Sequence, residues 1–218
     1  MKNARRYLVL THAPRAFAVN SILIDILMLF EHGVCLGDSL TTGARSRYGV
    51  AESLSEQLNR ATNKRWLFRC EATNGETVLQ QLRRLDQKPW LWKDATFCSL
   101  IIGTNDAKSS VDTPPEIFQM LYGQILDRLA VAKVMLFPAS IPDLLSGASL
   151  ASPYDSKCME RIRRFNEVIN SECKCRGLSD VMVDLTGLGA DCFVDGVHFS
   201  EAGIDQVAKR FAEKIIRR

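Results

Sequence analysis

The chain has 218 residues, of which 46% are hydrophobic and 24% charged, a composition typical of a soluble globular domain. The 28 basic and 25 acidic residues leave a net charge of +3, and no Lys/Arg run is interleaved with aromatic residues, which argues against a nucleic-acid-binding protein. The seven cysteines contain no C-x-x-C pair, which argues against a zinc site and a disulfide framework. We therefore expect a reducing, cytoplasmic location, with a secreted or membrane-associated form as the alternative.

Residues 1–32 form an N-terminal extension that is basic and then apolar. Asn20 and Asp25 interrupt the apolar run, and no small-residue cleavage site follows, which argues against a signal peptide. The run is also too short and too polar to span a bilayer. Apolar residues recur at helical spacing, so residues 16–31 are predicted to form an amphipathic helix docked on the domain. Attachment to a membrane surface and a start codon placed too far upstream are the alternatives.

Short apolar runs alternate with helical patterns from residue 33 onward, which predicts one domain over 33–218. The predicted strands are 33–37, 65–70, 96–102, 133–138 and 180–185, each of a kind buried on both faces. The helical patterns lie near 49–63, 76–87, 113–129, 155–176 and 201–217. Parallel neighbours need crossover connections, so this order predicts an α/β fold, a flavodoxin-like three-layer α/β/α sandwich with a five-stranded parallel sheet.

The first predicted strand ends abruptly in "GDSLTTG" (37–43). Gly37 lets the backbone turn, and Asp38 and Ser39 can bond to nearby backbone amides, so one interpretation is a turn with a capping serine. The other is a nucleophile, because sites in open parallel sheets form beyond the carboxyl ends of the strands. This stretch alone favours the capping serine, and the segments that follow the other strands have to decide.

A hydrolytic serine needs a base, a group that orients the base, and donors for the oxyanion. His198 follows the last predicted strand, and Asp195 precedes it at a spacing that lets a turn bring both side chains to one cleft. A carboxylate bonded to one imidazole nitrogen leaves the other nitrogen to face Ser39. Gly75 after the second strand offers a backbone N–H, and Asn105 after the third offers a side-chain amide, as oxyanion donors.

Together these segments resemble the four motif blocks of the SGNH (GDSL) hydrolases. "GDSLTTG" matches the first block, "TNGET" is similar to the second, "IGTNDAK" to the third and "DGVHFSEAG" to the last, and the match runs from about residue 33 to the C-terminus. The resemblance implies Ser39 as the nucleophile and His198 as the general base, oriented by Asp195. It also implies an oxyanion hole formed by the Ser39 amide, the Gly75 amide and the Asn105 side chain.

The family acts on esters, thioesters and acetylated sugars without a metal or an organic cofactor. The resemblance thus implies a serine hydrolase that cleaves small-molecule carboxylic esters, acyl or acetyl and including those of carbohydrates, through an acyl-enzyme on Ser39. An acyltransferase, a thioesterase and a non-catalytic binding domain of the same fold are the alternatives. A nucleotide or flavin binder is a further alternative, although the sequence has neither G-x-G-x-x-G nor G-x-x-x-x-G-K-[ST].

Substrate contacts are less clearly indicated by the sequence. Arg45 and Tyr48 follow the nucleophile block and are candidates for contact with an anionic or sugar substrate, with a solvated loop as the alternative. Tyr154, in the loop 139–154, is a candidate wall of the acyl pocket or a packing residue.

Overall fold

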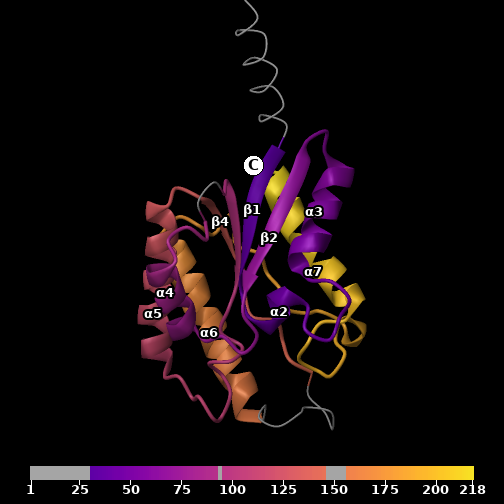
Figure 1. The fold of residues 1–218 in the computed structure, drawn as a ribbon. Coiled ribbons are helices and arrows are strands. Elements are labelled where there is room, and N and C mark those ends of the chain that lie inside the picture. The colour runs from indigo at the N-terminus through magenta and orange to yellow at the C-terminus, as the bar shows by residue number, and fades with distance from the viewer. Residues whose placement is uncertain (1–29, 93–94, 146–155) are drawn as a thin grey trace, which may run out of the picture. The chain divides into compact units, whose positions relative to one another are not determined.

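The computed structural model describes residues 30–92, 95–145 and 156–218. A four-stranded sheet with the order β2-β1-β3-β4 lies at the centre, with helices on both of its faces (Figure 1). β1 pairs in parallel with β3, and β3 pairs in parallel with β4. The strands are β1 (Phe30–Gly37), β2 (Arg65–Ala72), β3 (Phe97–Ile101) and β4 (Met135–Pro138). The predicted flavodoxin-like three-layer α/β/α class is confirmed.

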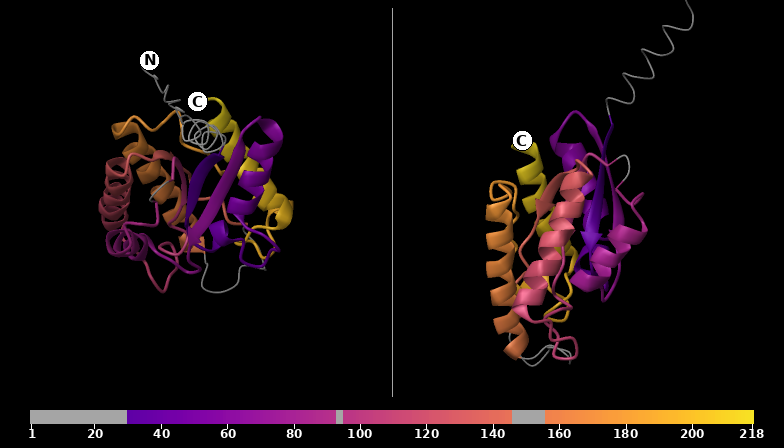
Figure 2. Two further views of the ribbon diagram at one scale, coloured as in Figure 1. Left: turned by 45° about the horizontal axis from the view of Figure 1, so that its top comes forward. Right: turned by 90° about the vertical axis from the view of Figure 1, so that its left-hand side faces the viewer.

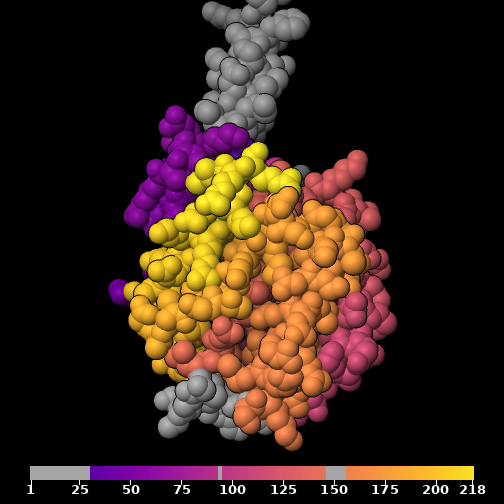
Figure 3. All heavy atoms as spheres, turned by 180° about the vertical axis from the view of Figure 1, so that it is seen from behind, coloured from indigo at the N-terminus to yellow at the C-terminus, as the bar shows by residue number. Residues whose placement is uncertain are grey.

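The five longer helices lie close to the predicted ranges, whereas two short ones have no predicted counterpart. The helices are α2 (Ser39–Thr42), α3 (Val50–Ala61), α4 (Val78–Gln87), α5 (Pro115–Val131), α6 (Ser156–Cys175), the short 3-10 helix η1 (Ala190–Cys192) and α7 (Glu201–Ile216). α4, α5 and α6 cover one face of the sheet, and α3 and α7 cover the other (Figures 1 and 2). Seen from behind, α6 and α7 form much of the surface (Figure 3). None of the helices within the described ranges is long and apolar enough to cross a membrane.

Alternating side chains of the central strands supply two hydrophobic cores. In β1, Val34 and Leu36 belong to the core beneath α4, α5 and α6, whereas Cys35 between them belongs to the core beneath α3 and α7. Leu100 and Ile101 of β3 divide in the same way. Because successive side chains of a strand point to opposite faces, an unbroken apolar run is what a central strand of this sandwich needs.

β2 differs from the prediction of two buried faces. Trp66 and Phe68 are buried against the α3 side, whereas Arg65, Leu67 and Arg69 are exposed. β2 is an edge strand of the sheet, and α4 to α6 do not extend far enough to cover its outer face (Figure 1). The apolar run 65–70 therefore alternates between core and solvent, as an edge strand can.

The predicted fifth strand, residues 180–185, is reduced to one isolated parallel bridge between Ala139 and Val183. The sheet therefore has four strands in place of the predicted five. The ladder stops because the Ser140 hydroxyl oxygen accepts the Leu185 N–H at 2.7 Å, in place of a strand carbonyl. A side chain thus takes over the hydrogen bond that a longer β4 would have made.

β1 begins at Phe30, upstream of the predicted start at residue 33. The last residues of the predicted amphipathic helix, Phe30 and Glu31, are therefore strand. The rest of that helix and of the N-terminal extension lies outside the described residues, as does Tyr154.

Candidate active site

Ser39 is the first residue of α2, directly beyond the end of β1. Gly37 has φ 146°, and a Cβ added there would lie 2.1 Å from the carbonyl oxygen of Ile101, so the turn requires glycine. The helix is capped by Asp38, whose Oδ1 accepts the Leu40 N–H at 2.9 Å. Ser39 is only 7% exposed, and its hydroxyl makes no hydrogen bond within the described part of the chain. Asp38 thus takes the capping role and leaves the Ser39 hydroxyl free for another one.

Asp195 and His198 are in contact in the turn before α7. Asp195 Oδ2 lies 2.9 Å from His198 Nδ1, and Oδ1 accepts the backbone N–H groups of Val197 at 3.1 Å and His198 at 2.8 Å. Partial burial acts to raise the pKa of Asp195, but the hydrogen bonds from His198 and Val197 outweigh it and lower the pKa below its usual value. The carboxylate therefore stays ionised, and a proton on Nδ1 leaves Nε2 as the basic nitrogen.

The loop after α2 ties the serine to the turn that holds the histidine. Arg45 Nε lies 3.0 Å from Asp195 Oδ2, and the Ser46 hydroxyl donates to the carbonyl of Phe199 at 2.7 Å. No hydrogen bond joins Ser39 to His198 in the described structure, which is common before a substrate is bound. The loop after α2 and the turn before α7 are thus anchored to each other. A hydrogen bond between the Ser39 hydroxyl and the His198 imidazole would have to form when substrate binds.

The predicted oxyanion donors lie in two loops next to the serine. Asn105 is buried, and its Nδ2 donates to Asp38 Oδ2 and to the carbonyl of Glu76, both at 3.0 Å. Gly75 has φ 78°, a conformation that glycine adopts readily. The backbone N–H groups of Ser39 and Gly75 donate no hydrogen bond among the described residues. These two donors are therefore free to meet an oxyanion, whereas Asn105 must share or exchange a partner to do so.

Three acidic side chains, Asp38, Asp106 and Glu76, adjoin the predicted site residues in sequence. The sequence predicts a role in the turn for Asp38 and singles out neither of the other two. Burial raises the pKa of Asp38 to about 7, and burial raises that of Asp106 to about 6. Asp106 Oδ2 accepts the Val78 N–H at the start of α4. Burial also raises the pKa of Glu76, although Arg84 pairs with it through two hydrogen bonds of 2.8 Å each. All three flank a predicted oxyanion residue or the serine in sequence, and for Asp106 and Glu76 that proximity was the only available signal.

Tyr48, a predicted substrate contact, donates its hydroxyl to Asp205 Oδ2 of α7 at 3.0 Å. Arg45, the other described candidate, contacts Asp195 instead of standing free in solvent. No group of three or more His, Cys, Asp or Glu side chains in the described ranges is placed to hold a metal ion.

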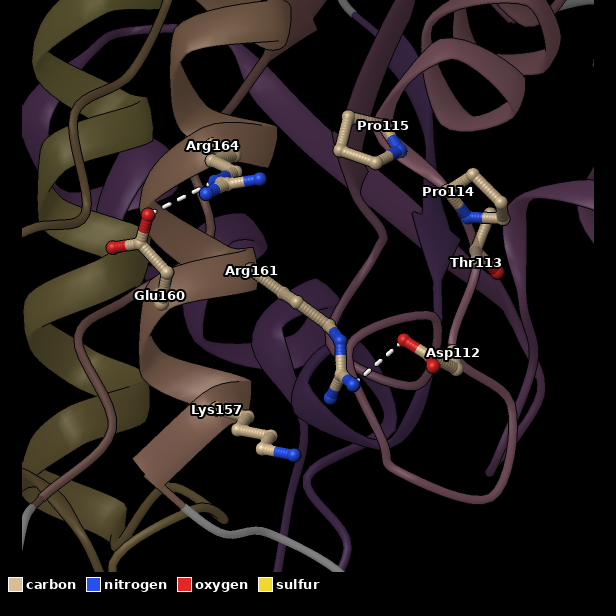
Figure 4. A pocket seen from close by; sticks show the side chains of 8 residues that line it. All are labelled: Asp112, Thr113, Pro114, Pro115, Lys157, Glu160, Arg161 and Arg164. Atoms are coloured by element: carbon tan, nitrogen blue, oxygen red, sulfur yellow. Dashed lines mark hydrogen bonds and ion pairs between the residues drawn. The ribbon is translucent and has the colours of Figure 1, made fainter.

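The loop that begins at Asn105 is anchored at its far end against α6. Arg161 donates to the carbonyl of Ala107 at 3.0 Å and pairs with Asp112 at 2.6 Å, across a hollow of about 410 Å³. Figure 4 shows Arg161 reaching from the helix to the loop, with Pro114 and Pro115 on the opposite wall. The contact with α6 therefore holds the loop at Ala107 and Asp112.

A model of the GDSL-like lipase/acylhydrolase family matches residues 35–205, which is most of the chain and includes all the motif blocks. No significant relative is found among curated protein sequences.

Solved structures of similar fold cover nearly the same region. The lipase/acylhydrolase from Enterococcus faecalis has a TM-score of 0.71 at 19% identity, over 85% of this chain and 95% of that one. The aryl esterase of M. smegmatis has a TM-score of 0.70 at 15% identity, over 86% and 99%. A carbohydrate acetylesterase from Sinorhizobium meliloti has a TM-score of 0.68 at 15% identity, also over 86% and 99%. At these identities the likeness shows a shared fold.

Proposed function

Because this protein belongs to the GDSL-like lipase/acylhydrolase family and is an esterase, we propose that it cleaves carboxylic esters through an acyl-enzyme on Ser39. The observation that carries the proposal is the contact between Asp195 Oδ2 and His198 Nδ1, in a turn anchored to the segment that follows the serine. Acyl transfer requires an imidazole that a carboxylate orients and a serine hydroxyl within its reach.

In the acylation step, His198 Nε2 takes the proton of the Ser39 hydroxyl as the oxygen attacks the ester carbonyl. Asp195 holds the ring and stabilises the imidazolium that forms. The tetrahedral intermediate collapses when its bond to the alkoxy oxygen breaks, and His198 gives the proton to that oxygen, so that an alcohol leaves. Water then attacks the acyl-enzyme with the same base, which releases the acid and restores the Ser39 hydroxyl.

The oxyanion would be met by the free N–H groups of Ser39 and Gly75 and by the Asn105 amide. Asn105 is already held at the correct edge of the sheet by Asp38 and the Glu76 carbonyl. Because both Nδ2 hydrogens are already donated, Asn105 would have to share or exchange one of these acceptors to bind the oxyanion.

The substrate class that fits this site is a small-molecule ester with an acyl or acetyl group, with sugar esters included. Two of the solved structures of similar fold are an aryl esterase and a carbohydrate acetylesterase, which supports this range. A transferase would use an alcohol in place of water at the second step, and a thioesterase would release a thiol.

The test is hydrolysis of p-nitrophenyl acetate, butyrate and octanoate near pH 8 by the wild type and by Ser39→Ala. Turnover should vanish in this variant. The acyl chain length that the wild type hydrolyses fastest should indicate how large the acyl pocket is. Ser110→Ala is the matched control, because it removes the same hydroxyl from an exposed serine and should leave turnover unchanged.

Equal rates in the wild type and Ser39→Ala would remove Ser39 from the nucleophile role. Absence of turnover in both, together with no labelling of Ser39 by a serine-reactive phosphonate, would favour the non-catalytic binding domain. Faster release of p-nitrophenol when an alcohol is added, with formation of a new ester, would favour the acyltransferase.

A further inference from the structure

Arg45 shares the Asp195 oxygen that contacts the imidazole. Its Nε lies 3.0 Å from Asp195 Oδ2, and the same oxygen lies 2.9 Å from His198 Nδ1. The other oxygen, Oδ1, is occupied by the backbone N–H groups of Val197 and His198. A single carboxylate oxygen therefore faces a guanidinium on one side and the predicted general base on the other.

The backbone at Arg45 points to a use for this side chain. Arg45 has φ 73°, in the left-handed region where a residue with a Cβ is disfavoured and glycine is not. Backbone strain of this kind is found mostly at functional sites, where the surrounding contacts hold the residue in its disfavoured conformation. The Arg45 side chain is 60% exposed, so burial of apolar surface does not explain its presence.

We propose that Arg45 is a positioning residue, which holds the Asp195 carboxylate against His198 and sets the pH range in which the imidazole can act as a base. This inference rests on the proposed function, because it assigns His198 the role of base. A cation beside Asp195 offsets part of the negative charge that favours the imidazolium. Removal of the Arg45 charge should therefore move the acid limb of the pH–rate profile to higher pH.

Several other charged groups of the described residues near this turn have partners of their own. From the same loop, Arg47 pairs with Glu201 of α7 at 2.5 Å. From α7, Asp205 accepts from Tyr48 and Ser53. From the loop after β4, Asp143 accepts the Gly187 N–H at 3.0 Å. From the end of β1, Asp38 is bonded to Asn105. Within the described residues Arg45 is the one cation paired with Asp195, apart from His198 when it is protonated.

The neighbouring pair provides a matched control. Arg47 lies in the same loop and also binds an acid of the last motif block, but its partner Glu201 shares no hydrogen bond or ion pair with His198 among the described residues. Arg47→Gln removes the same charge from the same loop without touching the Asp195 carboxylate. A general effect of loop charge would appear in both variants, whereas a specific effect on the dyad would appear only at Arg45.

The test compares kcat/KM for p-nitrophenyl acetate between pH 5 and 9 in the full chain. Arg45→Gln should move the acid limb of the profile by roughly half a pH unit to higher pH, since an exposed cation acts through screened charge. Arg45→Lys, which keeps the charge, should retain most of the wild-type profile, and Arg47→Gln should match the wild type.

Arg45→Gly separates this role from a structural one. It relieves the left-handed backbone, so its melting temperature should equal or exceed that of the wild type, while its acid limb shifts as in Arg45→Gln. A purely structural role would instead lower the melting temperature and leave the pH profile in place.

A measurement that needs no turnover keeps this proposal distinct from the proposed function. NMR titration of ¹³C-labelled histidine, with the His198 signal assigned by its loss in His198→Gln, should show the same half-unit movement in Arg45→Gln. If Ser39→Ala keeps wild-type turnover, the esterase mechanism fails, and the titration still tests Arg45. Identical His198 titration curves in the wild type and Arg45→Gln would overturn the inference.

Discussion

Two aspartates flank the candidate site, and their environments set them apart. Asp38, next to Ser39, is fully buried, and burial raises its pKa to about 7. Asp195, beside His198, is partly exposed and is surrounded by donors that lower its pKa despite that partial burial. The first carboxyl group is suited to hold structure in place, whereas the second is suited to carry a charge that steadies an imidazolium. Identical side chains therefore serve different parts of the site.

The largest effect should come from neutralising Asp195. Asp195→Asn keeps the side-chain shape but removes the charge that fixes the imidazole tautomer, so kcat should fall by roughly 10³-fold to 10⁴-fold. Steady-state hydrolysis of p-nitrophenyl acetate measures this. Asp180→Asn makes the same change at an exposed acid and should leave kcat unaltered. A fall of less than tenfold in Asp195→Asn would mean that His198 does not depend on Asp195.

Asn105→Ala should have the next largest effect, because it removes the side-chain amide that donates to Asp38. Loss of one oxyanion donor should lower kcat by roughly 10²-fold to 10³-fold. The same change removes a donor to buried Asp38, so the free energy of unfolding should fall by about 1–3 kcal/mol. Kinetics and urea denaturation measure the two effects, with exposed Asn63→Ala as the control. Lower stability with an unchanged kcat would assign Asn105 a structural role alone.

The pH dependence of stability should differ in sign between the two aspartates. The unfolded chain releases the Asp38 proton near pH 4, whereas the folded protein keeps it until about pH 7. Between these values the folded state binds more protons, so the free energy of unfolding should fall as pH rises, by a few kcal/mol in order of magnitude. Asp195, with its lowered pKa, contributes stability above pH 4 that is lost as pH falls further.

Urea denaturation between pH 4.5 and 7.5 measures the Asp38 effect. Asp38→Asn should flatten the dependence, and the slope that remains should come from Asp106, whose pKa burial raises to about 6, and from Glu76, whose pKa burial also raises. A slope equal to that of the wild type in Asp38→Asn would show that the Asp38 carboxyl is ionised in the folded protein throughout this range.

The smallest effect is expected from Tyr48→Phe. The Tyr48 hydroxyl donates to Asp205 at the surface, so its loss should lower the free energy of unfolding by about 1 kcal/mol. Because that hydroxyl is engaged with α7, kcat and KM should stay at their wild-type values. Thermal melts and steady-state kinetics test both expectations, and a raised KM would instead establish Tyr48 as a substrate contact.

The order of elements was predictable because it follows from local patterns. The buried, mostly apolar runs 33–37 of β1 and 97–101 of β3 reflect burial on both faces. Three errors concern the margins of the sheet, and one of them is the start of β1 at Phe30. Whether β2 is covered on both faces depends on how far the helices extend, and the missing fifth strand depends on a hydroxyl of Ser140 that replaces a ladder bond. The alternation of β2 is visible in its sequence, whereas the Ser140 hydrogen bond leaves no periodic signal.

The candidate site divides along the same line. The sequence alone indicated Ser39, Gly75, Asn105, Asp195 and His198, because each follows a predicted strand and parallel strands bring their carboxyl ends to one edge. Only the tertiary structure decided which side chains those residues contact. Asp38 bonds Asn105 across 67 positions of the chain, and Arg45 reaches Asp195 from a separate loop. The position of each site residue at the end of a strand follows from local sequence, which largely controls secondary structure. The ion pairs and the burial of these residues depend instead on the packing of segments that lie far apart in the chain.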